Sequence, residues 1–380
     1  MALSDNDKAA LALHKKLHGK ITLALRQNPD SVEKLGLFYT PGVAAVSRQT
    51  AQEPQTTRDY TWTGNNVAVI SDGSAVLGLG NIGPEGALPV MEGKALLFKH
   101  FANIDGVPIV LNTQDPDEII ATVKAIAPSF GGINLEDIAA PQCFYIEEAL
   151  KEAIDIPVFH DDQHGTAIVV LAGLINAMKL SDKSLSNSKI VVAGAGAAGT
   201  AIVKLLYKYA QPEMYMIDSK GIISAGRSDL NKEKQKLLEY TNTEGLDGSL
   251  EVAMKGADIF IGVSKAGLIT EAMVRSMNKD PVIFAMANPE PEIMPDQAAK
   301  AGAAVIATGR SDFPNQINNA VCFPGVFRGA LDNRVRMITD EHKLQAAEAI
   351  AALVDTPRAD CIIPSVLDER TVSAIANVIR

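Results

Sequence analysis

A glycine-rich turn after an apolar run constrains the fold of this chain more than any other feature. In "KIVVAGAGAAGTAIVKLLYKYA", Gly194, Gly196 and Gly199 have the spacing G-x-G-x-x-G directly after "KIVVA". In a strand–turn–helix unit these glycines permit the turn, close approach to a pyrophosphate, and close packing of the helix. The helix start, with Ala197 and Ala198, favours the phosphate charge. The stretch predicts a doubly wound, Rossmann-type unit with a dinucleotide site.

The residue at the end of the next apolar run bears on which dinucleotide is bound. Asp218 ends "MYMID", where an acidic residue hydrogen-bonds the adenosine ribose and favours NAD. Lys220 and Arg227 follow, and such cations can accommodate a 2′-phosphate. We interpret these two as ordinary solvated surface charges, and the choice between NAD and NADP stays open.

Short apolar runs also alternate with helical patterns in the first half of the chain. The helical patterns are "PDEIIATVKAIA" and "CFYIEEALKEA", and the runs predict buried strands. These strands are expected at Val67–Ser71, Val107–Asn112, Gly132–Leu135 and Ile156–Phe159. Continuous apolar strands alternating with helices predict a parallel sheet covered on both faces.

Four carboxylates follow two of these predicted strands. Glu136 and Asp137 come after the third, and Asp161 and Asp162 after the fourth. The carboxyl ends of parallel strands face one shared crevice, where gathered carboxylates repel one another unless a cation or a proton compensates. Oxygen ligands suit Mg²⁺ or Mn²⁺. The alternative is that these residues cap the helices that follow them.

The histidines of "PVFHDDQHGTA" raise the question of zinc. His160 and His164 have the H-x-x-x-H spacing, which needs both side chains on one continuous helix. A strand pattern precedes them and Gly165 follows, so we expect no shared helical face. Neither histidine is our first choice as a metal ligand.

A long apolar helix is expected from Thr166 to Leu180, followed by the polar stretch Ser181–Ser188. We therefore expect an α/β protein of two domains. An N-terminal substrate- and metal-binding domain is predicted over residues 1–163. The Rossmann-type NAD(P)-binding domain, with C-terminal helices that pack back across the fold, is predicted over residues 164–380.

Composition excludes several classes of protein. The net charge is −10 and no basic block stands out, which argues against binding to nucleic acid or to an anionic membrane. No apolar run is long enough to span a membrane, and the N-terminus lacks the pattern of a signal peptide. Three scattered cysteines fit reduced thiols. The expected location is the cytoplasm.

Seven ordered stretches together resemble the malic enzyme family, in the short form found in bacteria. They are "FYTPGV", "DGSAVLGLGNIGPEGALPVMEGKALLFK", "NLEDI", "HDDQHGTA", "VVAGAGAAG", "ANPEPEI" and "INNAVCFPG". The resemblance implies oxidative decarboxylation of L-malate to pyruvate and CO₂ with reduction of NAD or NADP, a bound Mg²⁺ or Mn²⁺, and a homodimer. The alternatives are a malolactic-type or oxaloacetate decarboxylation without net cofactor reduction, and a non-catalytic NAD(P)-binding sensor.

The resemblance also implies roles for single residues. Lys94 is similar to the family's general base, which also contacts substrate, and Tyr39 to its general acid. Asp161 is similar to a proton-relaying partner of Lys94. The implied metal ligands are Glu136, Asp137 and Asp162. The residues that resemble substrate contacts are Asn288, which also reaches the nicotinamide, and the pair Asn318 and Asn319.

Two further points bear on these roles. Lys94 lies in the apolar context "VMEGKALLF", where burial lowers a lysine pKa toward use as a base. Ala75 stands where larger family members carry an arginine that clamps the substrate carboxylate. Carboxylate recognition is therefore expected from Lys94 or the asparagines.

Overall fold

The first of two sheets is parallel throughout and contains β1 (Asn66–Ser71), β2 (Asp105–Val110), β3 (Ile133–Leu135) and β4 (Val158–His160) in the order β2-β1-β3-β4. The computed structural model describes residues 5–76, 78–181 and 183–380. All four strands lie at the predicted runs. The helices between them are α5 (Gly83–Ala102), α6 (Pro116–Ile126) and α7 (Gln142–Ala153).

Strand β1 demonstrates that this sheet is covered on both faces. Val67 and Val69 belong to the core cluster that includes Phe98 of α5, whereas Ala68 and Ile70 belong to the cluster that includes α6 and α7. Successive side chains of a strand point to opposite faces, so the continuous apolar run serves two separate cores.

The second sheet has the order β10-β9-β8-β5-β6-β7. Its strands are β5 (Lys189–Ala193), β6 (Glu213–Asp218), β7 (Gly221–Ile222), β8 (Ile259–Gly262), β9 (Val282–Ala285) and β10 (Val305–Thr308). Its helices are α9 (Ala197–Ala210), α10 (Lys232–Leu237), α11 (Leu250–Met254), α12 (Glu271–Arg275) and α13 (Pro295–Lys300). Strand β5 pairs with β6 on one side and β8 on the other, so the strand order reverses at the glycine turn. Open sheets bind ligands at such a switch point. The predicted α/β fold class is confirmed, although the sequence patterns did not predict β7 or β10.

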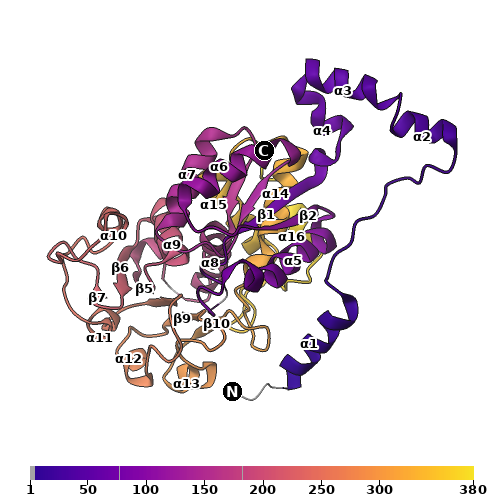
Figure 1. Ribbon diagram of the computed structural model, residues 1–380. Coiled ribbons are helices and arrows are strands. Elements are labelled where there is room, and N and C mark those ends of the chain that lie inside the picture. The colour runs from indigo at the N-terminus through magenta and orange to yellow at the C-terminus, as the bar shows by residue number, and fades with distance from the viewer. Residues whose placement is uncertain (1–4, 77, 182) are drawn as a thin grey trace.

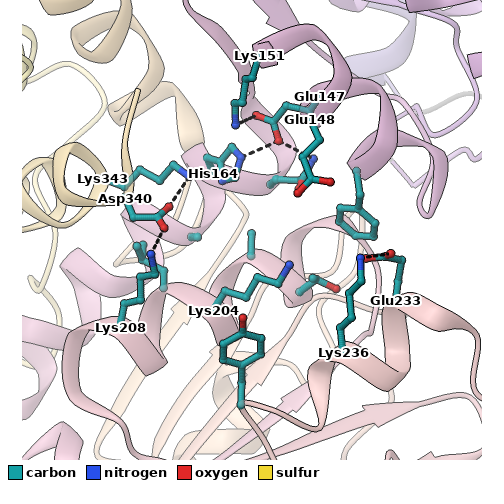
Figure 2. A pocket seen from close by; sticks show the side chains of 17 residues that line it. Glu147, Glu148, Lys151, His164, Lys204, Lys208, Glu233, Lys236, Asp340 and Lys343 are labelled. Atoms are coloured by element: carbon teal, nitrogen blue, oxygen red, sulfur yellow. Dashed lines mark hydrogen bonds and ion pairs between the residues drawn. The ribbon is translucent and has the colours of Figure 1, made fainter. Parts of the chain in front are cut away.

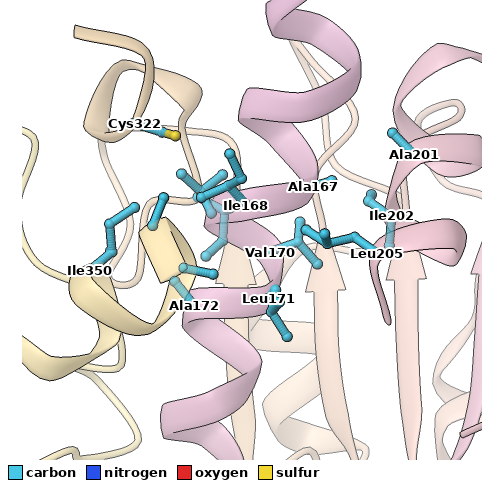
Figure 3. Close-up of a cluster of buried hydrophobic side chains, with 14 of the residues drawn as sticks. Ala167, Ile168, Val170, Leu171, Ala172, Ala201, Ile202, Leu205, Cys322 and Ile350 are labelled. Carbon is cyan, nitrogen blue, oxygen red and sulfur yellow. The ribbon is translucent and has the colours of Figure 1, made fainter. Parts of the chain in front are cut away.

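Helix α8 (Asp161–Met178) joins the two sheets. It begins at Asp161, so the expected start at Thr166 was wrong: the helix follows β4 directly, with two acidic residues in its first turn. Figure 3 shows α8 between α9 and α15 (Asp340–Ala352), with apolar side chains filling the space. At its far end the Asn176 amide donates to the carbonyls of Ala351 and Ile362, at 2.9 and 3.0 Å.

The C-terminal helices contact both halves of the molecule. Helix α14 (Phe323–Asp332) packs on α5, where Phe98 meets Phe323 and Phe327 edge-on at centroid distances of 4.7 and 5.3 Å. Helix α15 packs on α8, and α16 (Arg370–Ala376) packs on α14 and α15. The sequence limits of the two domains remain a prediction, since helices after residue 322 contact both α5 of the first half and α9 of the second.

The first part of the chain forms an extended N-terminal arm, residues 5–56. It carries α1 (Asp5–Leu17), α2 (Val32–Phe38) and α3 (Val43–Gln52), and α4 (Thr57–Tyr60) connects it to the body. Figure 1 shows α2 and α3 projecting away from both sheets. These three helices bury none of their described side chains.

Five 3₁₀ segments complete the secondary structure of the described residues. They are η1 (Pro54–Thr56), η2 (Trp62–Asn65), η3 (Ala127–Ser129), η4 (Leu185–Asn187) and η5 (Asn319–Val321). In the described ranges, every helix is either too short or too polar to cross a bilayer.

Candidate active site

Lys94 of α5 forms the centre of a buried charge cluster. Its ammonium donates to the Asp161 carboxylate and lies 3.0 Å from Oε1 of Glu136. Burial by itself lowers the pKa of Lys94, but the charges of Asp161 and Glu136 outweigh burial and raise it above its ordinary value. The expectation of a lowered Lys94 pKa was therefore wrong, because the apolar sequence context did not reveal these two carboxylate partners.

Three carboxylates converge beside this lysine. One oxygen each from Glu136, Asp137 and Asp162 lies within 4.8 Å of the others. Glu136 and Asp137 follow β3, and Asp162 lies in the first turn of α8, so the sheet edge brings them together. Asp137 has a left-handed backbone (φ 55°), and its amide donates to Asp162 Oδ2 at 2.8 Å.

The helix-capping alternative fails for the pair after β3. Helix α7 starts at Gln142 and its N-cap is Pro141, so neither Glu136 nor Asp137 caps it. Asp161 does lie at the start of α8, but its carboxylate bonds Lys94 across the interface with α5. These acidic residues therefore face one another instead of separate helix ends.

The charge balance of the cluster fits a bound cation. Burial raises the pKa of Glu136 well above its usual range; the Lys94 ammonium opposes this, and the charge of Asp162 adds to it. Asp161 is fully buried, and its Oδ1 has no hydrogen-bond partner among the described residues. A set of carboxylate oxygens with excess negative charge suits Mg²⁺ or Mn²⁺.

The two histidines do not share a helical face, as expected. His160 is the extended N-cap residue of α8, whereas His164 lies inside the helix. His164 Nε2 lies 2.8 Å from Glu147 of α7, and burial lowers its pKa to about 3 although Glu147 opposes this. The zinc spacing is therefore not a zinc site in this fold.

A loop between β1 and α5 covers the carboxylates. Ala75 donates its amide to the Asp137 carbonyl at 2.9 Å, and the Ser74 hydroxyl accepts from the Ala139 amide at 2.8 Å. Gly73 has φ +70°, and a Cβ there would lie 2.1 Å from the Gly83 carbonyl oxygen. The exposed Ala75 side chain thus stands at the rim of the cluster, and it has no group that can bind a carboxylate.

The predicted asparagines come from the second half of the chain. A Cβ at Gly165 would lie 3.2 Å from Cβ of Asn319, which places Asn319 against the first turns of α8. Asn318 accepts the Ala320 amide at 2.8 Å and so caps η5. A Cβ at Gly78 would lie 2.2 Å from the Asn288 carbonyl oxygen, so the Asn288 loop meets the loop that covers the carboxylates.

The glycine turn has the geometry that its spacing predicted. Gly194 has φ +120°, and a Cβ at Gly199 would lie 1.9 Å from the Gly194 carbonyl oxygen. A Cβ at Gly196 would meet nothing within 4 Å, so the space beside this residue is open. Ala197 and Ala198 begin α9 there. The open cradle at a helix start fits a pyrophosphate.

Asp218 at the end of β6 lines an adjoining cavity of about 430 Å³. Its carboxylate accepts from the Arg227 guanidinium, the Lys234 ammonium and the Lys220 amide at 2.6–3.0 Å. Arg227 is only 14% exposed, so the interpretation of this residue as a solvated surface charge was wrong; Lys220, at 65%, is solvated. A ribose hydroxyl would share Asp218 with these donors.

Comparison with known proteins decides the family. A family model described as "Malic enzyme, N-terminal domain" matches residues 16–151, and one described as "Malic enzyme, NAD binding domain" matches residues 163–379. The chain belongs to the malic enzyme family. The resemblance of the seven stretches is thereby confirmed.

Individual malic enzymes are similar over most of the chain. A bifunctional malic/malolactic enzyme of Bacillus subtilis (strain 168) is 56% identical over 97% of this chain and 91% of its own. An NAD-dependent malic enzyme of Geobacillus stearothermophilus is 52% identical over 95% and 76%. The crystal structure of an NAD-dependent malic enzyme from Thermotoga maritima has a TM-score of 0.95 at 50% identity, covering 97% of this chain and 98% of that one.

One residue expected in the site of this malic enzyme lies elsewhere. Tyr39 follows α2 on the N-terminal arm and is 69% exposed, and Figure 1 shows α2 projecting away from the sheets. The remaining predicted site residues lie around the carboxylates or around the glycine turn. Sequence reasoning also missed Phe323, whose ring centre lies 4.3 Å from the Lys94 ammonium and supports it as a cation–π partner.

Proposed function

We propose that this malic enzyme converts L-malate to pyruvate and CO₂ with reduction of NAD⁺ or NADP⁺, in a reaction that depends on a divalent metal. The observation that carries the proposal is the cluster of Glu136, Asp137 and Asp162 beside the buried Lys94–Asp161 pair. The proposal assigns this chemistry to residues 1–163 and cofactor binding to residues 164–380.

Glu136, Asp137 and Asp162 would hold Mg²⁺ or Mn²⁺. The metal would supply Lewis acidity at the substrate oxygens, which favours both ionisation of a hydroxyl and loss of CO₂ from a β-keto acid. Three protein carboxylates leave coordination positions for substrate and water. Asp137 and Asp162 already hold each other through the 2.8 Å hydrogen bond, which orients the set.

Lys94 would take the proton of the C2 hydroxyl as hydride leaves C2 for the nicotinamide. A base must be neutral, and Glu136 now pairs with the ammonium at 3.0 Å. When Glu136 binds a metal, its negative charge stabilises the Lys94 ammonium less. The burial of Lys94 then favours the neutral amine. Asp161 keeps its hydrogen bond to Lys94 and would receive or orient the released proton.

The cofactor and the substrate carboxylates have distinct proposed contacts. Gly196, with the start of α9, would hold the pyrophosphate, and Asn288 would contact the nicotinamide and the substrate. Position 75 is an alanine in place of the arginine of larger family members. Asn318 and Asn319, with Lys94, would bind the substrate carboxylate instead. Asp218 would hydrogen-bond a ribose, in competition with Arg227 and Lys234.

We place the general acid Tyr39 in trans and propose a homodimer. Ten large apolar side chains of the arm are half-exposed or more: Leu11, Leu13, Leu17, Leu23, Leu25, Val32, Leu35, Leu37, Phe38 and Tyr39. Such a surface marks a protein interface. An arm that reaches a second copy would bury these side chains and carry Tyr39 to the partner's carboxylates, where it would protonate C3 of the enolate left by decarboxylation.

Initial rates with L-malate and Mn²⁺, comparing NAD⁺ with NADP⁺, test the function. The expected result is reduced nicotinamide and pyruvate in equal amounts, with no turnover in EDTA. Lactate without net reduced cofactor would identify the malolactic alternative, and nucleotide binding without turnover would identify the sensor.

Metal binding itself is tested without turnover. Asp137→Asn is expected to weaken Mn²⁺ binding at least about 100-fold in calorimetry, because it removes one of three ligands. Glu152→Gln, an exposed carboxylate on α7, serves as the matched control. Equal Mn²⁺ affinity in the Asp137 variant would contradict the assignment.

A further inference from the structure

A second charged cavity lies between the two halves of the chain, apart from the carboxylate cluster. Its volume is about 320 Å³, within the lower range of small-molecule sites. Figure 2 shows its walls: α7 and α8 on one side, α9 and α10 on the other, and α15 closing one end. A ligand here would contact residues of both halves at once.

Most charges around this cavity are paired. Lys151 pairs with Glu147 at 2.7 Å, and Lys236 with Glu233 at 2.8 Å. Asp340 forms ion pairs with both Lys208 and Lys343. The exposed Glu148 also lies on the wall, so the lining contains five lysines and four acidic residues.

Among the five lysines of this lining, Lys204 of α9 is the exception. It points into the cavity in Figure 2 and makes no hydrogen bond or ion pair with any residue that the structure describes. It is partly buried, so water does not fully solvate its ammonium. A cation in a recess that forms no ion pair of its own is suited to an anionic ligand.

We propose that this cavity is a binding site for a compact anion with two negatively charged groups, held chiefly by Lys204. Thr200, Lys204 and Lys208 recur every four residues on α9 and therefore lie on one face, about one turn apart. A second anionic group can thus reach Lys208, whose partner Asp340 is already shared with Lys343. Small dicarboxylates and phosphates have this chemistry.

The far wall connects the cavity to the first turn of α8. Glu147 accepts the His160 backbone amide at 3.1 Å and lies 2.8 Å from His164 Nε2. Asp161 and Asp162 are the residues that follow His160. An anion that attracts Lys151 away from Glu147, or that fixes α9 against α7, would therefore change the position of the proposed metal ligands. This regulatory consequence rests on the proposed function, whereas binding itself does not.

Calorimetry on the full chain in EDTA tests the binding, with succinate and inorganic phosphate as separate probes. EDTA removes metal-dependent binding of succinate to the carboxylate cluster. At least one probe is expected to bind, and Lys204→Gln is expected to weaken it about tenfold or more, as loss of a charged hydrogen bond does. The tighter probe identifies the ligand as a carboxylate or a phosphate.

Two further variants make the result decisive. Lys204→Arg retains the charge and is expected to restore most of the affinity, whereas Lys124→Gln, an exposed lysine on α6, is expected to change nothing. Binding of neither probe, or an equal loss in the Lys124 variant, would overturn the proposal. Failure of malate turnover would not affect this measurement, so the two proposals are tested separately.

If the proposed function holds, the tighter probe is expected to change the KM for malate of the wild type and not that of Lys204→Gln. The basal kcat of Lys204→Gln is expected to equal the wild-type value. An unchanged KM in the wild type would overturn the regulatory consequence and leave the binding site to be judged by calorimetry.

Discussion

The Lys94 ammonium bridges Asp161, to which it donates a hydrogen bond, and Glu136, whose carboxylate lies 3.0 Å away. One buried cation thus joins the proposed proton partner to a proposed metal ligand. Any cation that occupies the carboxylate cluster competes with Lys94 for Glu136. The same carboxylate therefore links metal occupancy to the protonation of the base.

Replacement of Lys94 with alanine is expected to lower kcat for malate oxidation by about 10²–10⁴-fold, the usual contribution of a general base. Nucleotide binding should persist, because the glycine turn lies in the other sheet. The rate of nicotinamide reduction and a fluorescence titration with the dinucleotide measure the two effects. Lys99→Ala, an exposed position on the same helix, is the control. Normal turnover in Lys94→Ala would contradict the assignment.

Gly196→Ala is expected to fold normally and to weaken dinucleotide binding by about tenfold or more, since a methyl group would occupy the space of the pyrophosphate. A Cβ there meets no protein atom within 4 Å. Gly199→Ala should instead destabilise the protein, because its Cβ would lie 1.9 Å from a backbone oxygen. Thermal unfolding and titration with NAD⁺ separate these outcomes, and Mn²⁺ binding by Gly196→Ala should equal that of the wild type.

Mixed dimers test the position of Tyr39. Tyr39→Phe and Lys94→Ala homodimers are each expected to be inactive. If Tyr39 acts in trans, co-refolding equal amounts should restore about a quarter of wild-type activity, because about half of the dimers are mixed and each has one intact site. No recovery, in a sample whose mixed dimers are verified by mass, would place Tyr39 and Lys94 on the same chain's site.

Acid should remove the stabilising effect of Asp218. Burial favours its neutral form, but the hydrogen bonds from Arg227 and Lys234 outweigh burial and hold its pKa at about 2, below the ordinary value of 3.8. Because the folded-state pKa is lowered, the stabilisation is complete above the ordinary value and is lost as the pH falls toward 2. The Tm difference between the wild type and Asp218→Asn should therefore be largest near neutrality and shrink in this acid range.

The control for this pH series is Asp360→Asn, whose ion pair with Arg358 is exposed. It is expected to change Tm little at any pH, as surface pairs contribute about 0–1 kcal/mol. A Tm difference for Asp218→Asn that is independent of pH would show that packing, and not charge, determines its contribution.

The sequence predicted the parts of the fold that depend on local pattern. Buried parallel strands such as β1 are continuous apolar runs, and the spacing of Gly194, Gly196 and Gly199 determines a turn. The start of α8 was missed because "HDDQHG" interrupts the apolar pattern and holds a glycine. That stretch is helical because it follows β4 and packs inside the protein, which is a tertiary effect.

The charge partners could not be read from the sequence for the same reason. Lys94 and Asp161 are 67 positions apart, and only the meeting of α5 with α8 pairs them. Arg227 looked solvated because its burial depends on a loop that folds back to Asp218. The role proposed for Tyr39 depends on a second chain, about which one sequence gives no geometric information.

Helix α8 sets a strict limit on how this chain can change in length. Its first turn supplies Asp161 and Asp162, and its last turn holds the C-terminal segment through Asn176. An insertion or deletion of one residue within it would rotate one end against the other by about 100°. Either the carboxylates or the C-terminal anchor would then point the wrong way. Length variation is expected to accumulate in surface loops and to be absent from these eighteen positions.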